Sequence, residues 1–423
     1  MSSYDARIVD LELDELLPGL AAISLDGPKG VGKTATAQQR AVTTFALDDA
    51  AQRELLLADP RRLASARTPV LLDEWQRLPE AWDLVRREVD RNPEAARFLL
   101  TGSASPVDAP THSGAGRIVR LRMHPMTLAE RRLAKPTVSL RDLLENPQAQ
   151  IDGHTEIGLR QYAEEIVASG FPGIRSLPAR ARRAQLDGYI NGIVEHDFAE
   201  QGVKVRRPQS LRAWLSAYAA ATSTSASYNA ILDAATAGES SKPAKTTTMV
   251  YRDTLSQLWL LEPLAGWLPT TNAFTRMAQA PKHHLTDPAL AARLLGLDVP
   301  ALLNNRTTPT VRGDGSFLGA LFESLIALQI RVFSQVAEAH PYHLRTRNGD
   351  HEVDFIVQRP DQRILAIEVK LGASVGESDV RHLKWLRAQL GEELITAAVV
   401  NTGPHAYRRP DGIAVIPAAL LGP

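Results

Sequence analysis

The residues with the clearest capacity for chemistry form a glycine-rich segment near the N-terminus. Gly27 is followed after four residues by Gly32, Lys33 and Thr34, and an apolar run at 20–25 leads into the segment. Glycines let backbone N–H groups close around phosphate oxygens, and a following helix presents its positive end to the same group. A lysine and a threonine at this spacing reach the β- and γ-phosphates and Mg²⁺, respectively, so we predict a nucleotide site. The alternative, a glycine-rich surface turn, would not explain the Lys-Thr pair. The predicted contact residues are Gly27, Pro28, Lys29, Gly30, Val31, Gly32, Lys33, Thr34 and Ala35.

Two carboxylates follow a second apolar run, at residues 69–72. Asp73 at the end of a buried strand could hold Mg²⁺ through water, and Glu74 could orient and deprotonate an attacking water. Alternatively, the pair could begin a helix, where acidic side chains favour the positive end of the helix dipole. The position downstream of the phosphate loop favours the nucleotide interpretation.

A third apolar run, at 97–100, leads to Thr101 and Ser103. A hydroxyl at this point could sense the γ-phosphate, and we predict that role for Ser103. Either hydroxyl could equally cap the next helix.

A separate constellation lies near the C-terminus. Asp354 falls in an apolar strand at 352–358, and Glu368 and Lys370 fall in another at 364–371. A five-residue hairpin loop between the strands would place Asp354 opposite Glu368, where like charges destabilise a sheet. Lys370 is one candidate to offset them, and Mg²⁺ or Mn²⁺ bound by Asp354, Glu368 and Glu323 is another. The alternative is an internal ion cluster that Lys370 alone neutralises.

Composition narrows the class of protein. The 423 residues carry 48 basic and 48 acidic side chains, so the whole chain is unsuited to coating nucleic acid, although a local basic face remains open. The absence of cysteine excludes disulfides and cysteine metal sites and fits a reducing compartment. We expect a cytoplasmic protein without a signal peptide or a membrane-spanning stretch.

The pattern along the chain predicts three regions. The first ~130 residues alternate apolar strands with helical stretches, which favours a parallel sheet with helices on both faces. Thr127 and Glu130 have the spacing of a capping box and predict a helix start. Residues 150–305 read as mainly helical, with a helix-turn-helix outline, and the piece 204–253 has seven basic and three acidic residues, or about +4. The predicted helices there are 162–169, 180–199, 210–221, 225–237 and 246–261. The last ~110 residues predict a helix at 319–336, strands at 352–358, 364–371 and 394–401, and a helix at 378–390.

Together these segments resemble a known family. Asp354 with Glu368-Val369-Lys370 resembles the PD-(D/E)XK nuclease motif. Behind the phosphate loop, the chain is similar to bacterial and archaeal AAA-type ATPases with a C-terminal domain of unknown function that looks like this nuclease fold. The matching stretches are LDGPKGVGKT (25–34), LLDEWQRLP (71–79), FLLTGSAS (98–105), GRIVRLRMHPMTLAE (116–130), SGFPG (169–173), LGALFESLIALQI (318–330), EVDFIV (352–357) and IEVK (367–370).

The resemblance implies an α/β protein with three domains. These are a P-loop AAA-type ATPase domain (1–150), a mainly helical winged-helix-like domain (151–310) and a C-terminal α/β PD-(D/E)XK nuclease-like domain (311–423). It implies ATP rather than GTP as the nucleotide, and Arg117 as a γ-phosphate contact in the same or a neighbouring subunit, with Arg120 and Arg122 as alternatives.

Two main hypotheses follow. In the first, ATP hydrolysis drives an enzyme that cuts or remodels DNA, with Lys33 and Glu74 catalytic in one site and Asp354, Glu368 and Lys370 in the other. In the second, the protein is a nucleotide-controlled switch whose nuclease-like domain only binds a partner or dimerises, so a homo-oligomer is expected. A small-molecule phosphotransferase ranks below both, because the Asp73-Glu74 pair suits water as acceptor.

Overall fold

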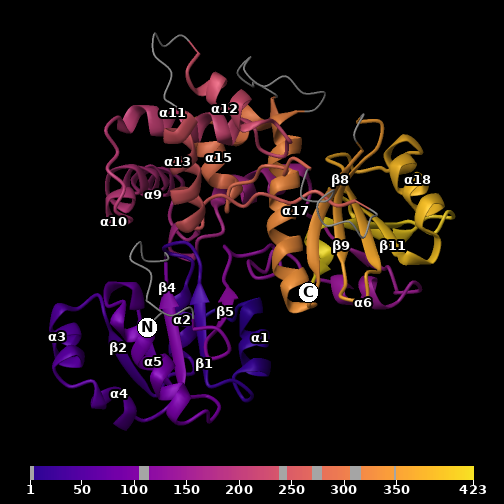
Figure 1. Ribbon diagram of the computed structural model, residues 1–423. Helices are drawn as coiled ribbons and strands as arrows, with labels where there is room; N and C mark the ends of the chain where they lie inside the picture. Colours follow the sequence, from indigo (N-terminus) through magenta and orange to yellow (C-terminus); the bar gives the residue numbers. More distant parts are fainter. Residues whose placement is uncertain (1–3, 104–113, 238–244, 269–278, 305–315, 347–348) are drawn as a thin grey trace.

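Two α/β regions flank a helical region in the computed structural model, which describes residues 4–423 except 104–113, 238–244, 269–278, 305–315 and 347–348 (Figure 1). The N-terminal region lies beneath the helical region in this view, and the C-terminal sheet lies beside both. The long helix α17, Phe317–Val336, runs between them.

The N-terminal region is built on a five-stranded parallel sheet with the order β2-β3-β4-β1-β5. This confirms the predicted parallel α/β arrangement. Parallel strands covered on both faces are read in sequence as nearly continuous apolar runs, as β1 and β4 are here. The elements are α1 Ile8–Leu16, β1 Ala22–Asp26, α2 Lys33–Gln38, β2 Thr43–Ala46, α3 Ala50–Ala58, α4 Arg61–Ser65, β3 Val70–Asp73, α5 Glu80–Arg91, β4 Phe98–Gly102 and β5 Val119–Arg122.

Alternate side chains of this sheet enter two different hydrophobic clusters, as the two-residue period of a strand requires. Ile23 and Leu25 point into a cluster shared with α1, the helical region and α17. Ala22, one residue away, joins a second cluster with Trp82 and Val85 of α5. The first cluster is continuous through all three regions, so the N-terminal sheet packs directly against the rest of the protein.

The helical region contains the predicted helices, two of them altered, and also short helices at 172–175, 288–294 and 299–303 that were not predicted. The predicted helix 180–199 is continuous but passes through a π-helical turn, Ile193–Asp197, between α9 and α10. The predicted helix 246–261 ends at Gln257, because Trp259 has a φ of 62°. The predicted turn of the helix-turn-helix, 238–243, lies outside the described residues. The helices are α7 Leu159–Ala168, α8 Pro172–Arg175, α9 Ala179–Gly192, α10 Phe198–Glu200, α11 Pro208–Ala220, α12 Tyr228–Ala235, α13 Lys245–Gln257, α15 Pro288–Leu294 and α16 Val299–Leu303.

The predicted helix start at Thr127 was wrong, although its capping bonds form. The Thr127 N–H donates to Glu130 Oε2 at 2.7 Å, and the Glu130 N–H donates to Thr127 Oγ1 at 3.2 Å. The chain makes a turn and no helix, because Arg132 has a φ of 55° and ends the helical path.

The C-terminal region is a seven-stranded mixed sheet with the order β7-β12-β13-β11-β10-β9-β8. The hairpin register is confirmed, because Gln358 pairs with Ile364 and Phe355 with Ile367. Two short strands from the first half of the chain join this part of the fold: β7 pairs with β12, and β6 pairs with β14. The elements are β6 Val138–Ser139, α6 Leu140–Glu145, β7 Gly153–His154, β8 His340–Arg345, β9 Glu352–Gln358, β10 Ile364–Val369, α18 Arg381–Leu390, β11 Leu394–Asn401, β12 His405–Arg408, β13 Ala414–Pro417 and β14 Leu421–Gly422.

Helix α17 has the length and apolar composition of a membrane span. We did not identify it from the sequence, where we expected no such stretch. In this structure 78% of its most apolar window is buried within the protein. Its side chains pack against the helical region and the C-terminal sheet, which explains its apolar composition.

Candidate functional site

The predicted phosphate loop joins β1 to α2, and its glycines are required by geometry. Gly30 and Gly32 have φ angles of 76° and 109°, in the left-handed region that favours glycine. A Cβ on Gly27 would collide with the backbone carbonyl oxygen of Met123. A Cβ on Gly30, by contrast, would meet no atom within 4 Å. The loop is thus anchored at its base and open at Gly30, and this shape fits a bound phosphate.

Lys33 lies folded over this loop. Its Nζ donates to the carbonyl oxygens of Gly27 and Pro28 at 2.8 and 2.9 Å. Burial lowers the pKa of Lys33 to about 8, because the charged form is poorly solvated there, although Glu74 opposes the shift. An anionic phosphate beside the lysine would stabilise the charged form.

The two predicted magnesium residues are in direct contact. Thr34 Oγ1 donates to Asp73 Oδ1 at 2.7 Å, and the Thr101 hydroxyl donates to the same oxygen. The strands β1, β3 and β4 therefore bring the loop, the carboxylate and a hydroxyl together at one edge of the sheet. Oxygen donors of this kind suit Mg²⁺.

Glu74 is held beside this group by polar contacts. It has a φ of 54°, and its Oε2 accepts from Ser103 Oγ at 3.2 Å. Gln76 donates to the same carboxylate and to Ser103 Oγ, the latter at 3.1 Å. The structure thus brings Glu74 and the predicted sensor Ser103 together. Gln76 was not predicted from the sequence, although it lies two residues after Glu74 in the stretch LLDEWQRLP.

Arg117, the predicted γ-phosphate contact, pairs instead with Asp90 of α5 at 2.8 Å. Arg120, three residues farther along the chain in β5, lies beside the loop, with its Nε 3.6 Å from Asp26 Oδ2. Burial raises the pKa of Asp26, and the charge of Arg120 opposes that shift.

The helical region contacts the phosphate loop through Lys29. Its Nζ lies 2.6 Å from Asp197 Oδ1 and 2.9 Å from Glu200 Oε2. Glu200 also pairs at 2.8 Å with Arg77, which follows the acidic pair of β3. Glu200 therefore joins both nucleotide motifs to the helical region. Sequence reasoning missed these contacts, which span more than 120 residues of chain.

Arg7 supports the loop from behind. Its guanidinium donates to the Val31 carbonyl at 2.8 Å and to the His124 carbonyl at 2.7 Å. The same group pairs with Glu130 at 2.9 Å, and both side chains are at most 5% exposed. Glu130 thereby ties the segment after β5 to the phosphate loop.

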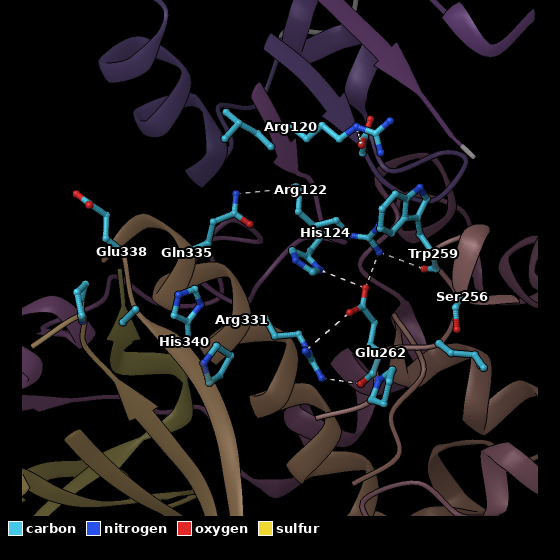
Figure 2. A pocket seen from close by; sticks show the side chains of 17 residues that line it. Arg120, Arg122, His124, Ser256, Trp259, Glu262, Arg331, Gln335, Glu338 and His340 are labelled. Atoms are coloured by element: carbon cyan, nitrogen blue, oxygen red, sulfur yellow. Dashed lines mark hydrogen bonds and ion pairs between the residues drawn. The ribbon is translucent and has the colours of Figure 1, made fainter. Parts of the chain in front are cut away.

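A cavity of about 930 Å³ opens where the three regions meet (Figure 2). Its wall carries a buried charge cluster in which Arg122, His124 and Arg331 converge on Glu262. Arg122 contributes from β5, Glu262 from the helical region and Arg331 from α17. Burial opposes ionisation of Glu262, but the guanidinium groups of Arg122 and Arg331 outweigh it and lower the pKa of that carboxyl.

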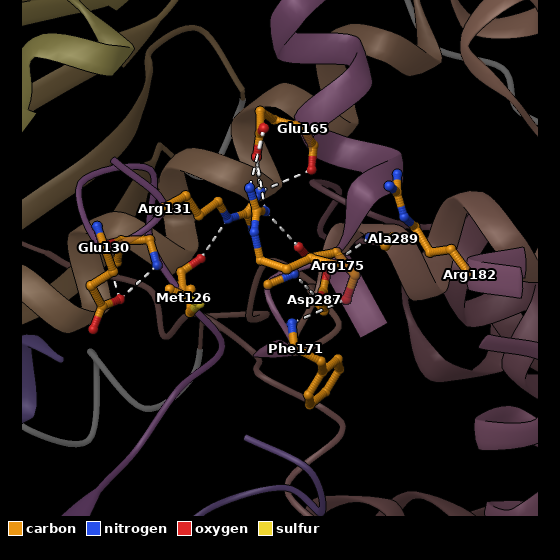
Figure 3. A network of polar contacts seen from close by, with 12 residues as sticks. Met126, Glu130, Arg131, Glu165, Phe171, Arg175, Arg182, Asp287 and Ala289 are labelled. Atoms are coloured by element: carbon orange, nitrogen blue, oxygen red, sulfur yellow. Dashed lines mark hydrogen bonds and ion pairs between the residues drawn. The ribbon is translucent and has the colours of Figure 1, made fainter. Parts of the chain in front are cut away.

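A second polar network explains the SGFPG stretch (Figure 3). Asp287 Oδ2 accepts from Ser169 Oγ at 2.6 Å and from the Gly170 N–H at 2.7 Å. Gly170 in turn accepts from the Met126 N–H at 2.8 Å. Arg131 and Arg175 meet on Glu165 in the same network. These contacts join the end of the N-terminal region to the helical region and to the segment that leads into α15.

The C-terminal carboxylates also come together, but around a cation that the sequence prediction did not include. Lys282 Nζ lies 2.9 Å from Glu323 Oε1 and 3.1 Å from both Glu352 Oε1 and Asp354 Oδ1. Lys370 pairs with Glu368 at 3.3 Å. The hypothesis that Lys370 alone neutralises the cluster was therefore wrong. Within the described part of the chain, no group of three or more carboxylates and histidines is arranged to hold a metal ion.

Burial and the neighbouring charges give the acids of this centre different pKa values. The pKa of Glu368 is raised well above its usual range by burial and by the neighbouring charge of Asp354. Burial also opposes ionisation of Asp354, but Lys282 and the Val369 N–H outweigh it and lower the pKa of that carboxyl. Burial raises the pKa of Glu323 to about 8. Asp354 and Glu368, which face each other on neighbouring strands, thus hold one proton between them, and Glu368 carries it.

Three family models match three separate parts of the chain, one in each region of the structure. Residues 21–131 match the AAA domain family, residues 159–301 match a domain of unknown function (DUF8612), and residues 318–421 match another (DUF4143). Uncharacterized proteins of Mycobacterium tuberculosis and Mycobacterium bovis are 26% identical over 407 residues, which cover 94% of this chain and 80% of each relative.

Two solved structures show partial likeness. The Walker-type ATPase PABY2304 of Pyrococcus abyssi is 14% identical with a TM-score of 0.40, over 67% of this chain and 94% of that one. The Drosophila ORC structure bound to DNA is 15% identical with a TM-score of 0.23, over 68% and 94%. At these scores neither likeness establishes a shared overall fold. The match of residues 21–131, together with the parallel sheet and its phosphate loop, shows that the N-terminal region is an AAA-type, P-loop ATPase domain.

Proposed function

We propose that this protein hydrolyses ATP with Mg²⁺ as cofactor. The observation that carries the proposal is the contact of Thr34 with Asp73 at 2.7 Å beneath a loop that also holds Lys33. When bound, Mg²⁺ neutralises phosphate charge. Thr34 and Asp73 would hold the ion, and Lys33 would stabilise the charge that develops on the β- and γ-phosphates. Ala35 and the loop backbone would complete the cradle.

Glu74 would activate the attacking water. Its carboxylate is fixed by Ser103 and Gln76, so its position is set before nucleotide binds. Such preorganisation lowers the cost of placing a water in line with the bond to be broken. The choice of adenine over guanine rests on the family resemblance.

Two substitutions test this assignment. Lys33→Ala should abolish tight ATP binding, whereas Glu74→Gln should retain binding and lose hydrolysis by about 10²–10⁴-fold. Binding is measured with a fluorescent ATP analogue and hydrolysis by phosphate release, with GTP as the comparison nucleotide. Lys135→Ala, at an exposed lysine outside the site, is the control. Full hydrolysis by Glu74→Gln would refute the role of Glu74, and tight binding by Lys33→Ala would refute the site.

We propose that nucleotide binding changes the position of the helical region. The phosphates would compete with Asp197 and Glu200 for the charge of Lys29, so binding should weaken the contact between loop and helix. The π-helical turn that ends at Asp197 places an irregular element at this junction, a feature common at functional sites. Because the chain lacks cysteine, single pairs of introduced cysteines can carry labels that report any movement.

DNA cleavage is the second candidate function: the convergence of Asp354, Glu368 and Lys370 favours it, whereas the position of Lys282 among the acids opposes a metal-dependent mechanism. The test is cleavage of supercoiled, linear and branched DNA with Mg²⁺ or Mn²⁺, with and without ATP, by wild type and Asp354→Ala. Cleavage lost in the variant would support a nuclease, and no cleavage on any substrate would exclude one. The winged-helix character of the middle region, a homo-oligomer and a cytoplasmic location remain predictions from the sequence.

A further inference from the structure

The carboxylate centre of the C-terminal region is assembled around the ammonium group of Lys282. Three acids contact its Nζ: Glu323 from α17, and Glu352 and Asp354 from β9, all within 3.1 Å. The lysine side chain is 2% exposed, so this group is enclosed by its partners. Burial disfavours the charged ammonium, but the three carboxylates outweigh it and raise the pKa of Lys282 well above its usual range.

Three of the four carboxylate oxygens of Asp354 and Glu368 already have other partners, and the buried Glu368 Oε1 has none among the described residues. Asp354 offers Oδ1 to Lys282, and its Oδ2 accepts from the Val369 N–H at 2.9 Å. Glu368 Oε2 pairs with Lys370. Divalent cations of this class require several oxygens at about 2.0–2.6 Å from one point, and here a nitrogen stands at that point. A metal ion could enter only against the charge of Lys282 or after its withdrawal, so the residues present do not fit a metal centre.

Lys282 is also fixed through its backbone. Its N–H donates to the Leu264 carbonyl at 2.9 Å, and its carbonyl accepts from the Leu264 N–H at 2.8 Å. Five residues later, the same segment carries Asp287, which binds Ser169 and Gly170 of the helical region. One short segment therefore has two buried anchors, the ion pairs of Lys282 and the hydrogen bonds of Asp287, one on each of two neighbouring regions.

We propose that Lys282 is the resident cation of this centre, and that the C-terminal acids form an ion-pair lock between the 279–287 segment and the C-terminal sheet. On this view the wild-type protein binds no divalent metal at Asp354. The proposal is independent of the ATPase assignment, and it goes beyond the sequence prediction, which named only Lys370 or a metal ion.

The first test is a titration of the full chain with Mn²⁺. Binding is measured from the electron paramagnetic resonance signal of the Mn²⁺ that stays free. Because Thr34 and Asp73 could also bind Mn²⁺, only the part of the binding that Asp354→Asn removes is assigned to the C-terminal centre. The proposal expects no such part in wild type at up to about 1 mM Mn²⁺, the weak end of oxygen-ligand sites. Binding by wild type that Asp354→Asn abolishes would overturn it, and this measurement needs no substitution at Lys282.

The second test compares two lysines. Lys282→Met removes the charge and keeps a long apolar chain, and Lys370→Met is the matched control at a 33% exposed position in the same centre. The thermal midpoint should fall more for Lys282→Met than for Lys370→Met, and adding Asp354→Asn should restore part of the loss. An equal or smaller fall for Lys282→Met would contradict the lock. Failure of Lys282→Met to fold, with Lys370→Met folded, would count as the extreme of the expected fall.

Discussion

Replacement of Arg7 by methionine should weaken both the stability of the protein and its affinity for ATP. Arg7 is buried and makes contacts with Glu130, the Val31 carbonyl and the His124 carbonyl. Removal of one partner from a buried ion pair typically costs about 3–5 kcal/mol, because the other charge is left uncompensated. Glu130 keeps three donors, from the backbone of Ile8 and from the backbone and hydroxyl of Thr127, so we expect the lower end, about 3 kcal/mol.

The loss of ATP affinity follows from the contact with Val31, which lies inside the phosphate loop. A hydrogen bond to a charged group contributes about 1.5–3 kcal/mol, and each 1.4 kcal/mol is tenfold in affinity. If the loop holds its binding shape through this bond, the Kd for ATP should rise by at least about tenfold.

The assay is urea unfolding followed by tryptophan fluorescence, together with titration of a fluorescent ATP analogue. Arg132→Met is the matched control, because that arginine is 73% exposed and pairs with Asp5 at the surface. The double variant Arg7→Met with Glu130→Gln should recover part of the lost stability, since it removes the uncompensated charge. Unchanged unfolding and unchanged ATP affinity in Arg7→Met would refute the reasoning.

Three further predictions concern the junctions between regions. Asp287→Ala should lower the free energy of unfolding by about 3 kcal/mol, because it removes a helix cap and leaves buried donors unsatisfied; a loss below about 1 kcal/mol in urea unfolding would contradict this. The pKa of His124 is lowered by burial to about 3, that of His343 to about 4, and that of His284 well below its usual value. The unfolded chain takes up protons on these histidines that the folded chain refuses, whereas the raised pKa values of Glu323 and Glu368 act in the opposite direction. His124→Gln should therefore remove about 1.4 kcal/mol of the stability loss that this histidine causes between about pH 7.5 and pH 5.5, and a variant with the pH dependence of the wild type would sink the assignment. Glu200→Gln should tighten ATP binding about two- to fivefold at low salt, because it frees the loop lysine and removes a negative charge near the phosphates; the exposed Glu195→Gln is the control, and an effect that persists at high salt would exclude this electrostatic cause.

Much of the nucleotide site could be predicted because its signals are local. The runs that became β1, β3 and β4 are apolar and end in the residues that bind phosphate and metal in such sites, and parallel pairing brings their ends together. The register of β9 and β10 followed from a short hairpin loop between two apolar runs. In each of these cases, neighbours in sequence determine the geometry.

The partners that sequence reasoning missed are distant along the chain. Lys282 lies 72 residues before Asp354 and reaches it through an isolated bridge to Leu264, which has no periodic pattern. Arg7 lies 123 residues from Glu130. The sequence around a single lysine or arginine does not identify its partner, so only the fold reveals which buried acid it compensates.

The position of the phosphate loop is set from three sides, and this limits how nucleotide binding can be transmitted. The base of the loop abuts Met123, and Arg7 holds Val31 through a buried ion pair, so both contacts resist movement. The contact of Lys29 with Asp197 and Glu200 is different, because these side chains are 14–37% exposed and each such pair is weak. Phosphate charge acts on all three sides of the loop, but only the weak contact can yield at a cost that ligand binding readily supplies. Movement should therefore begin between the loop and α10, and a label pair across that junction should respond to ATP before any pair across β5 does.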